Sequence, residues 1–184
     1  MQSQNNRAIR PFKGITPTLG EGAYIDPAAV VIGDVELGAD CSVWPLVVIR
    51  GDVNIVRMGD RSNIQDGSVI HESRPRPNNP AGFATIIGED VTVGHKVMLH
   101  GCHIGDRVLI GMGAIVLDGV VIENEVIVGA GALVTSGKRL QSGYLYTGSP
   151  ARQVRPLKES EISHFAQTTA EYIQLKNDYM VEPK

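Results

Sequence analysis

Histidine is the residue type in this chain that offers the clearest chemistry. His71 and His100 each follow directly after an aliphatic residue, and they are 29 positions apart. A neutral imidazole is among the commonest ligands of zinc and related transition metals. Two imidazoles bind one ion only if the fold brings them side by side, so the elements that position them decide whether this pair forms a site.

A six-residue repeat runs through most of the chain. Such a period fits neither a helix nor a continuously alternating strand, whereas it is typical of very short strands joined by tight corners. Steps of six give four frames of aliphatic residues with no polar member: Ile25, Val31, Leu37, Val43, Ile49 and Ile55; Met58, Ile64 and Ile70; Ile87, Val93 and Leu99; Ile104, Ile110, Val116, Ile122, Val128 and Val134.

The repeat predicts an inward-facing aliphatic column, with three six-residue units closing one coil. Glycine often follows the aliphatic residue, which indicates corners that need a positive φ. The glycines in this position are Gly38, Gly59, Gly88, Gly94, Gly105, Gly111 and Gly129.

We therefore expect an all-β solenoid, a parallel β-helix of hexapeptide repeats, over residues 1–155 and a C-terminal α-helix within 156–184. Residues 72–84 carry no period and contain three prolines, which indicates a loop excursion from the solenoid. After Pro156 the apolar residues recur at helical spacing, so this helix is expected to pack on the solenoid or on a neighbouring subunit. A β-sandwich is the alternative, but its turns recur about every 8–12 residues rather than every six.

The repeat also aligns the two histidines. Three units make a coil of about 18 residues, so the spacing of 29 residues between the two histidines exceeds one coil by 11. The step from Ile70 to Ile87 is 17 residues where six are expected, so an insertion of 11 residues in this segment accounts for the difference. His71 and His100 should therefore lie on one face of adjacent coils, about 4.8 Å apart, and share a metal at about 2.0–2.1 Å. His95 occupies a different slot near a corner and cannot easily reach the same metal within one subunit, although a neighbour packed by threefold symmetry could supply it.

Charge and composition exclude several classes of function. The net charge is −3, so no attraction to nucleic acid or to an anionic membrane is expected. No apolar run is long enough to span a bilayer, and residues 1–14 lack the apolar core of a signal peptide. Cys41 and Cys102 form no disulfide framework, so we expect a cytoplasmic location, with Cys102 a buried thiol rather than a ligand. His103 and His164 are expected to face solvent.

Several separated motifs resemble the γ-class carbonic anhydrase family of hexapeptide proteins, which includes proteins called ferripyochelin-binding. They are Val-Ile-Arg-Gly-Asp at 48–52, Asn-Ile-Gln-Asp-Gly at 63–67, Gly-His-Lys-Val-Met-Leu-His-Gly-Cys at 94–102 and Gly-Ser-Pro-Ala-Arg at 148–152. The resemblance implies a left-handed coil and a homotrimer with zinc between subunits. One subunit would supply His71 and His100, and its neighbour would supply His95.

The activity that the resemblance implies is the reversible hydration of carbon dioxide to bicarbonate by a metal-bound hydroxide. By resemblance, Gln65 positions the metal-bound water or substrate, and Asn63 lies close by. Arg50, Asp52 and Asp66 match family residues that form an ion-pair network at the subunit interface, a network that can also be purely structural.

Spacing adds a further expectation about two of these residues. Gln65 and Asp66 lie one six-residue step before His71, so they are expected close to the same metal. A tyrosine, either Tyr144 or Tyr146, is also expected to reach the metal pocket by resemblance.

Two departures from the family bear on catalysis. Active members carry a glutamate where this chain has Val53, and their acidic loop is here Glu72 followed by Arg74 and Arg76. Proton transfer to buffer is therefore expected to limit turnover.

The sequence leaves other functions open. Three imidazoles suit iron(II) or cobalt as well as zinc. The alternatives to a carbonic anhydrase are a metal-dependent thioesterase acting on acyl-CoA, a CoA-dependent hexapeptide acyltransferase, and a catalytically weak scaffold or binding protein.

Overall fold

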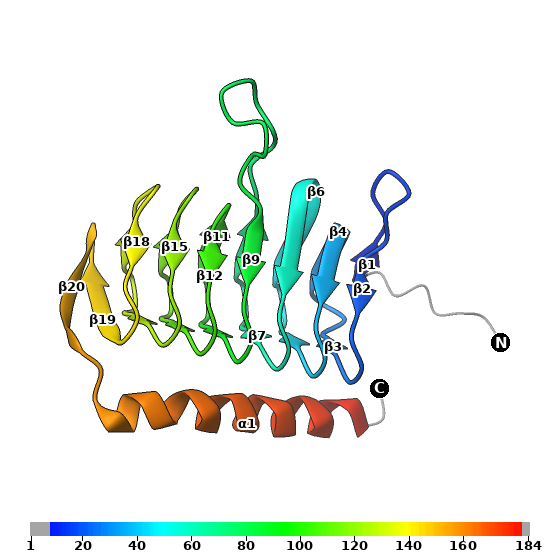
Figure 1. Cartoon of the computed structure of the whole chain (residues 1–184). Coiled ribbons are helices and arrows are strands. Elements are labelled where there is room, and N and C mark those ends of the chain that lie inside the picture. The colour runs from blue at the N-terminus through cyan, green and yellow to red at the C-terminus, as the bar shows by residue number, and fades with distance from the viewer. Residues whose placement is uncertain (1–7, 182–184) are drawn as a thin grey trace.

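The computed structural model describes residues 8–181 and has two parts, a β-solenoid and one long helix beside it (Figure 1). The solenoid is a left-handed parallel β-helix, as the six-residue repeat predicts. Its last strand ends at Pro156, and the helix begins at Glu159. The outer ends of the two predicted segments, 1–7 and 182–184, lie outside the described residues.

Three faces make up each coil. The first face contains β3 (Tyr24–Ile25), β5 (Ser42–Val43), β7 (Asn63–Ile64), β10 (Thr92–Val93), β13 (Leu109–Ile110), β16 (Ile127–Val128) and β19 (Tyr144–Gly148), with β20 (Ala151–Pro156) antiparallel to β19.

The second and third faces are joined by two long strands, β4 (Val30–Leu37) and β6 (Val48–Met58). The first half of β6 pairs with β8, and its second half pairs with β9, so β6 passes around the corner between these faces. The second face also contains β1 (Ile9–Arg10), β8 (Val69–His71), β11 (Met98–His100), β14 (Ile115–Val116) and β17 (Leu133–Val134). The third face also contains β2 (Thr18–Leu19), β9 (Thr85–Ile87), β12 (His103–Ile104), β15 (Val121–Ile122) and β18 (Arg139–Leu140).

The core is the aliphatic column that the repeat predicts, with one exception. Every repeat position except Ile55 is buried along the axis. Ile55 lies in a bulge of β6, where Gly33 pairs with Gly51 but Val35 pairs with Val56. The first frame therefore ends at Ile49, and the inward column continues through Val56 and Met58 because the bulge shifts the register by three residues.

The glycines after the aliphatic positions have a different reason from the predicted one. None of the seven has a positive φ; the positive-φ corner positions are held by other glycines and by residues such as Leu46 and Lys96. At Gly59, an added Cβ would lie 2.7 Å from the carbonyl carbon of Gly88 on the next coil. These glycines are needed because consecutive coils approach so closely that no side chain fits between them.

Helix α1 (Glu159–Val181) runs along the outside of the solenoid, parallel to its axis (Figure 1). It covers the first face, where Trp44 packs against Tyr172 and Tyr179 with ring centroids 5.7 and 5.3 Å apart. The buried Lys176 reaches Asp40 with 2.8 Å between Nζ and Oδ1. Among the described residues, no helix has the length and apolar character needed to cross a membrane.

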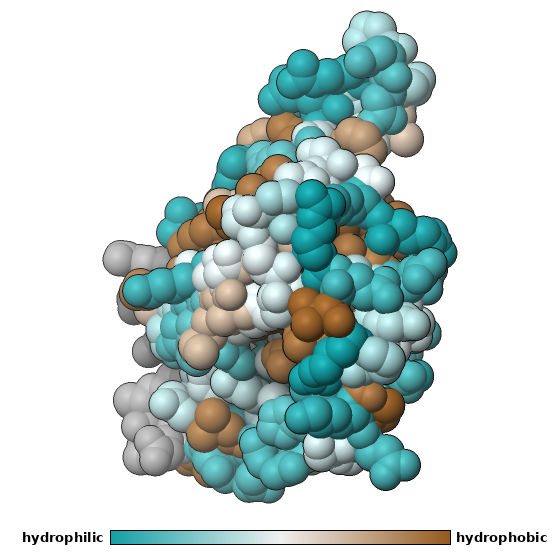
Figure 2. Space-filling model, turned by 90° about the vertical axis from the view of Figure 1, so that its left-hand side faces the viewer, coloured by the Kyte–Doolittle hydropathy of each residue, from teal (hydrophilic) through white to brown (hydrophobic). Residues whose placement is uncertain are grey.

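The predicted excursion is a hairpin that projects away from the solenoid (Figure 1). Antiparallel bridges join Ser73 to Phe83 and Arg76 to Asn79. Viewed along the solenoid axis, the hairpin forms a mostly hydrophilic projection above the body (Figure 2). It arises directly after His71, so its base lies beside the histidine pair.

Candidate metal centre

His71 and His100 lie side by side on the second face. Strands β8 and β11 pair in parallel, with His71 in register with His100. His71 Nδ1 is 3.2 Å from His100 Nε2. Two nitrogens that each bind one tetrahedral zinc at about 2.05 Å are separated by about 3.3 Å, so these facing nitrogens are spaced as two ligands of one ion require.

Carboxylates hold the outer nitrogens of both rings. His71 Nε2 is 3.1 Å from Asp52 Oδ1, and His100 Nδ1 is 2.6 Å from Asp118 Oδ1. In the neutral imidazole, the nitrogen facing a carboxylate carries the proton and the other carries a lone pair. Two lone pairs then face each other across 3.2 Å, an arrangement that a shared cation stabilises.

His95 has the same kind of partner at a different place. It lies at the corner between β10 and β11, its side chain is 44% exposed, and its Nδ1 is 2.9 Å from Asp66 Oδ2. Its Nε2 is therefore free to bind a metal outside its own chain. Of the five histidines, the three predicted ligands are those that pair with a carboxylate within residues 8–181; His103 and His164 form no such pair there.

Arg50 and Asp52 complete the surroundings of His71. Arg50 forms an ion pair with Asp52 Oδ2, while the other carboxylate oxygen faces His71. Burial alone would raise the pKa of Asp52, but the hydrogen bond with His71 and the charge of Arg50 outweigh it, so this pKa is lowered. Asp52 therefore stays ionised and keeps the ring of His71 in place.

Gln65 and Asn63 lie on the first face, not beside His71. Both are buried; Gln65 Nε2 donates to Asn63 Oδ1 at 3.3 Å, and Asn63 Nδ2 donates to Thr92 at 3.0 Å. Gln65 and Asp66 follow β7, so they belong to the corner that carries His95. One six-residue step moves the chain to the next face, so within one chain Gln65 and Asp66 lie on a different part of the coil from His71.

Glu72 is a further buried carboxylate at this site. Asp52, His71 and Glu72 offer ligand atoms within 4.8 Å of one another. Burial raises the pKa of Glu72, although hydrogen bonds from the backbone N–H groups of Val53 and Asn54 oppose the rise. Nothing in the sequence indicates this burial, because it depends on how the hairpin that follows Glu72 folds.

Comparison with known proteins places this geometry in a family. The family model described as bacterial transferase hexapeptide (six repeats) matches residues 16–51, 84–116 and 101–136. Protein YrdA of Escherichia coli K12 is 56% identical over 172 residues, which is 94% of each chain.

Two further relatives carry an activity in their names. Gamma carbonic anhydrase 1, mitochondrial, of Arabidopsis thaliana is 43% identical over 98% of this chain and 66% of its own. A protein of Geobacillus kaustophilus named carbonic anhydrase is 44% identical over 90% of this chain and 87% of its own. The chain belongs to the γ-class carbonic anhydrase family. Membership implies a metal cofactor, and the paired imidazoles with their carboxylates are a donor set that fits one.

Within one chain, the two tyrosines expected at the metal pocket, Tyr144 and Tyr146, lie on a strand that is separated from the coil of His95. Tyr146 is buried near the end of the solenoid, where its hydroxyl accepts from the N–H of Gln141 at 2.8 Å and donates to Gln153 at 3.2 Å. Tyr144 lies on the same strand, β19, and β13 and β16 separate that strand from the coil of His95. Tyr172 of α1 instead approaches the His95 corner: burial raises its pKa, and the Asp66 carboxylate adds to the rise.

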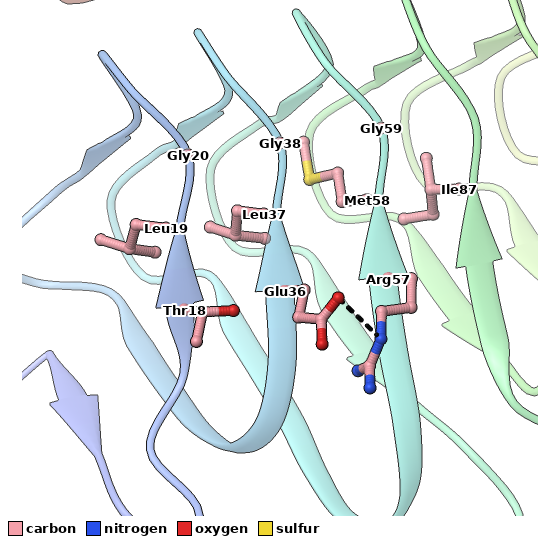
Figure 3. Close-up of a pocket in the computed structure, with 10 residues that line it drawn as sticks. All are labelled: Thr18, Leu19, Gly20, Glu36, Leu37, Gly38, Arg57, Met58, Gly59 and Ile87. Carbon is pink, nitrogen blue, oxygen red and sulfur yellow. Dashed lines mark ion pairs between the residues drawn. The ribbon is translucent and has the colours of Figure 1, made fainter.

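A hollow lies on the third face, away from the histidine pair (Figure 3). Its volume is about 470 Å³, and Leu19, Leu37, Met58 and Ile87 line it from four adjacent coils. Its charged groups are already paired, since Arg57 Nε lies 3.2 Å from Glu36. We therefore assign no chemical role to this hollow.

Proposed function

We propose that this chain is the subunit of a homotrimeric zinc enzyme that hydrates carbon dioxide reversibly, with each metal shared between two subunits. The observation that carries the proposal is that His71, His95 and His100 each have one ring nitrogen beside a carboxylate, while the second nitrogens of His71 and His100 face each other across 3.2 Å. Metal-binding histidines in proteins typically have this second partner.

An apolar ladder on the second face supports the trimer. Outward residues of a solvent-facing sheet are normally polar, but here one outward column is apolar in six successive coils and runs next to the histidine pair. Its members, in register, are Val30, Val48, Val69, Met98, Ile115 and Leu133.

A second copy packed on this ladder can bring its own corner to the histidine pair. That corner carries His95, and with it Asp66, Gln65 and, from α1, Tyr172. The residues that lie far from His71 within one chain then meet it across the interface, which is why the single chain holds only half of the proposed site.

Each residue has a distinct task in this arrangement. His71, His95 and His100 would hold the zinc, which when bound would supply a water of near-neutral pKa as the nucleophile for carbon dioxide. Asp52, Asp118 and Asp66 fix the rings, while the Gln65 amide would orient the substrate by hydrogen bonds across the interface.

The chain offers few groups to carry the released proton away. Val53 stands where active members carry a glutamate, the loop that is acidic in them carries Arg74 and Arg76 here, and Glu72 is buried and bound to backbone N–H groups. Turnover is therefore expected to depend steeply on buffer concentration.

Stopped-flow carbon dioxide hydration on zinc-loaded protein tests the proposal. We expect a rate well above the buffer background that rises with buffer concentration and disappears in His100→Ala. Zinc-saturated trimer with no rate above background at any buffer concentration would contradict it.

A hollow beside the hairpin favours one second candidate, cleavage of a thioester of coenzyme A. Its volume is about 180 Å³, and its lining includes Arg74, Arg76 and Asp118, the carboxylate that holds His100. The two guanidinium groups suit a phosphate-bearing substrate. Hydrolysis of acetyl-CoA that is lost in Arg74→Ala/Arg76→Ala, with carbon dioxide hydration unchanged, would favour this reading.

A further inference from the structure

The bulge of β6 begins with the residue that holds His71. Opposite it, β4 has one residue, Asp34, between the pairs Gly33–Gly51 and Val35–Val56, while β6 has four, residues 52–55. The inserted backbone leaves the regular ladder at this point, so its N–H groups need other acceptors. Asp52 is the first residue of this bulge and contacts His71.

One oxygen of Glu72 accepts three of these N–H groups. The backbone nitrogens of Asp52, Val53 and Asn54 lie 3.0, 3.0 and 3.1 Å from Glu72 Oε1. Successive N–H groups that converge in this way form a concave anion site. Here the anion is built into the chain, and its side chain is 1% exposed.

The remaining contacts of Glu72 make this clamp specific. Its other oxygen, Oε2, is buried without a hydrogen-bond partner among the described residues, so the three bulge N–H groups are what hold the carboxylate. Asn54 ties the same bulge to the hairpin, since its Nδ2 donates to the carbonyls of Ser73 and Ala81 at 3.0 and 2.9 Å. Bulge and hairpin base are thus joined as one unit around His71.

We propose that Glu72 is a positioning residue of the metal centre: by clamping the bulge it places Asp52 against His71 Nε2, which keeps His71 Nδ1 turned toward His100. The inference rests on the proposed metal function, and it adds a residue that touches neither metal nor substrate. Without the clamp, Asp52 moves with the loosened bulge, and the His71 ring is free to rotate and to change tautomer.

Two measurements separate positioning from mere stabilisation. The first is the zinc dissociation constant of the trimer, obtained by competition with a chromophoric chelator. The second is the tautomer of His71 in the metal-free protein, read from the ¹⁵N shifts of its ring. The variants are Glu72→Ala, Glu72→Asp, whose carboxylate is one methylene too short to reach all three N–H groups, and Glu72→Gln, which keeps the accepting oxygen.

Ser62→Ala is the matched control. Ser62 is also 1% exposed and also clamps backbone between coils, donating to Gly88 O at 2.8 Å and accepting from Val91 N–H at 2.9 Å, but its corner carries no histidine. It is expected to lower the melting temperature while zinc affinity and the His71 tautomer stay as in the wild type.

We expect Glu72→Ala to weaken zinc binding about 10- to 100-fold and to mix the His71 tautomers, with Glu72→Gln within about threefold of the wild type. If Glu72→Ala does not fold, Glu72→Asp carries the same expectation. Wild-type affinity and a single tautomer in the shortened variants would overturn the inference, as would an equal loss of affinity in Ser62→Ala. A wild-type protein that binds no zinc would instead sink the proposed function, and the tautomer of the metal-free variants would still decide the role of Glu72.

Discussion

At the scale of single residues, carboxylates decide which nitrogen of each candidate ligand is free. Asp52, Asp118 and Asp66 each take one ring nitrogen of a different histidine. Asp118 escaped the sequence analysis although it lies 18 residues, one coil length, after His100. The repeat that aligned the two histidines could have identified it.

Replacing Asp118 should weaken the metal site without unfolding the chain. In Asp118→Asn the amide no longer fixes the proton on His100 Nδ1, so zinc affinity should fall about 10- to 100-fold. Chelator competition measures this. Asp106→Asn is the control, because the Asp106 carboxylate accepts the backbone N–H of Glu89 and forms no ion pair with a histidine among the described residues. Equal zinc affinity in the two variants would show that Asp118 has no role.

Because both thiols are buried, we expect the folded chain to lose stability against unfolding at alkaline pH. Burial raises the pKa of Cys41 to about 11 and of Cys102 to about 12. Since the unfolded thiols ionise near pH 8.5, stability is fully present below that pH and falls as pH rises toward 11–12, by roughly 1–2 kcal/mol per thiol at about pH 10.

Urea unfolding at about pH 8 and pH 10 checks this, with Cys41→Ala/Cys102→Ala expected to lose less between the two values. Rapid alkylation of either thiol by iodoacetamide in the folded protein near neutral pH would contradict their burial.

At the scale of elements, the repeat was a sound guide to strands and faces but not to irregularities. The 11-residue excursion was counted correctly, and His71 pairs with His100 as that count required. The three-residue bulge of β6 went unnoticed because Ile55 and Met58 are both apolar, so a shift of register leaves the hydrophobic pattern intact. The burial of Glu72 was equally invisible, since it depends on how the hairpin folds back.

The glycine columns give a prediction at this scale. Gly59→Ala should destabilise the solenoid by about 2–4 kcal/mol, because its Cβ would lie within 3 Å of the Gly88 and Glu89 backbone and consecutive coils must separate. Gly137→Ala should cost only about 1–2 kcal/mol, since Gly137 has a φ of +71° but open space around its Cα. Chemical denaturation compares the two, and an equal loss would mean that coil spacing is not the constraint.

At the scale of the whole molecule, the chain presents an incomplete site next to an aliphatic ladder. Sequence spacing separated His95 from the other ligands correctly, because a corner and a face of one solenoid point in different directions. The spacing alone did not show which residues lie at the same corner as His95. Gln65 and Asp66 reach this corner from the first face, and Tyr172 reaches it from α1.

The ladder predicts how the trimer can be broken. Ile115, the fifth of the six ladder residues, is 40% exposed, and Ile115→Glu should place three charges in a desolvated interface and yield folded monomers with weak zinc binding. Sedimentation velocity and circular dichroism check this. Val154→Glu, at a residue 56% exposed on β20, should leave the assembly intact. A trimeric Ile115→Glu protein would place the interface elsewhere.

Mixed trimers of two defective subunits test the shared centre most directly. One subunit carries His95→Ala and the other carries His71→Ala/His100→Ala, and differently tagged copies allow trimers containing both to be isolated. In any such ring only one interface joins an intact histidine pair to an intact His95, so we expect about one zinc per mixed trimer, about three in the wild type and almost none in either parent. Mixed trimers without zinc, or full zinc in the His95→Ala parent, would contradict a metal held between subunits.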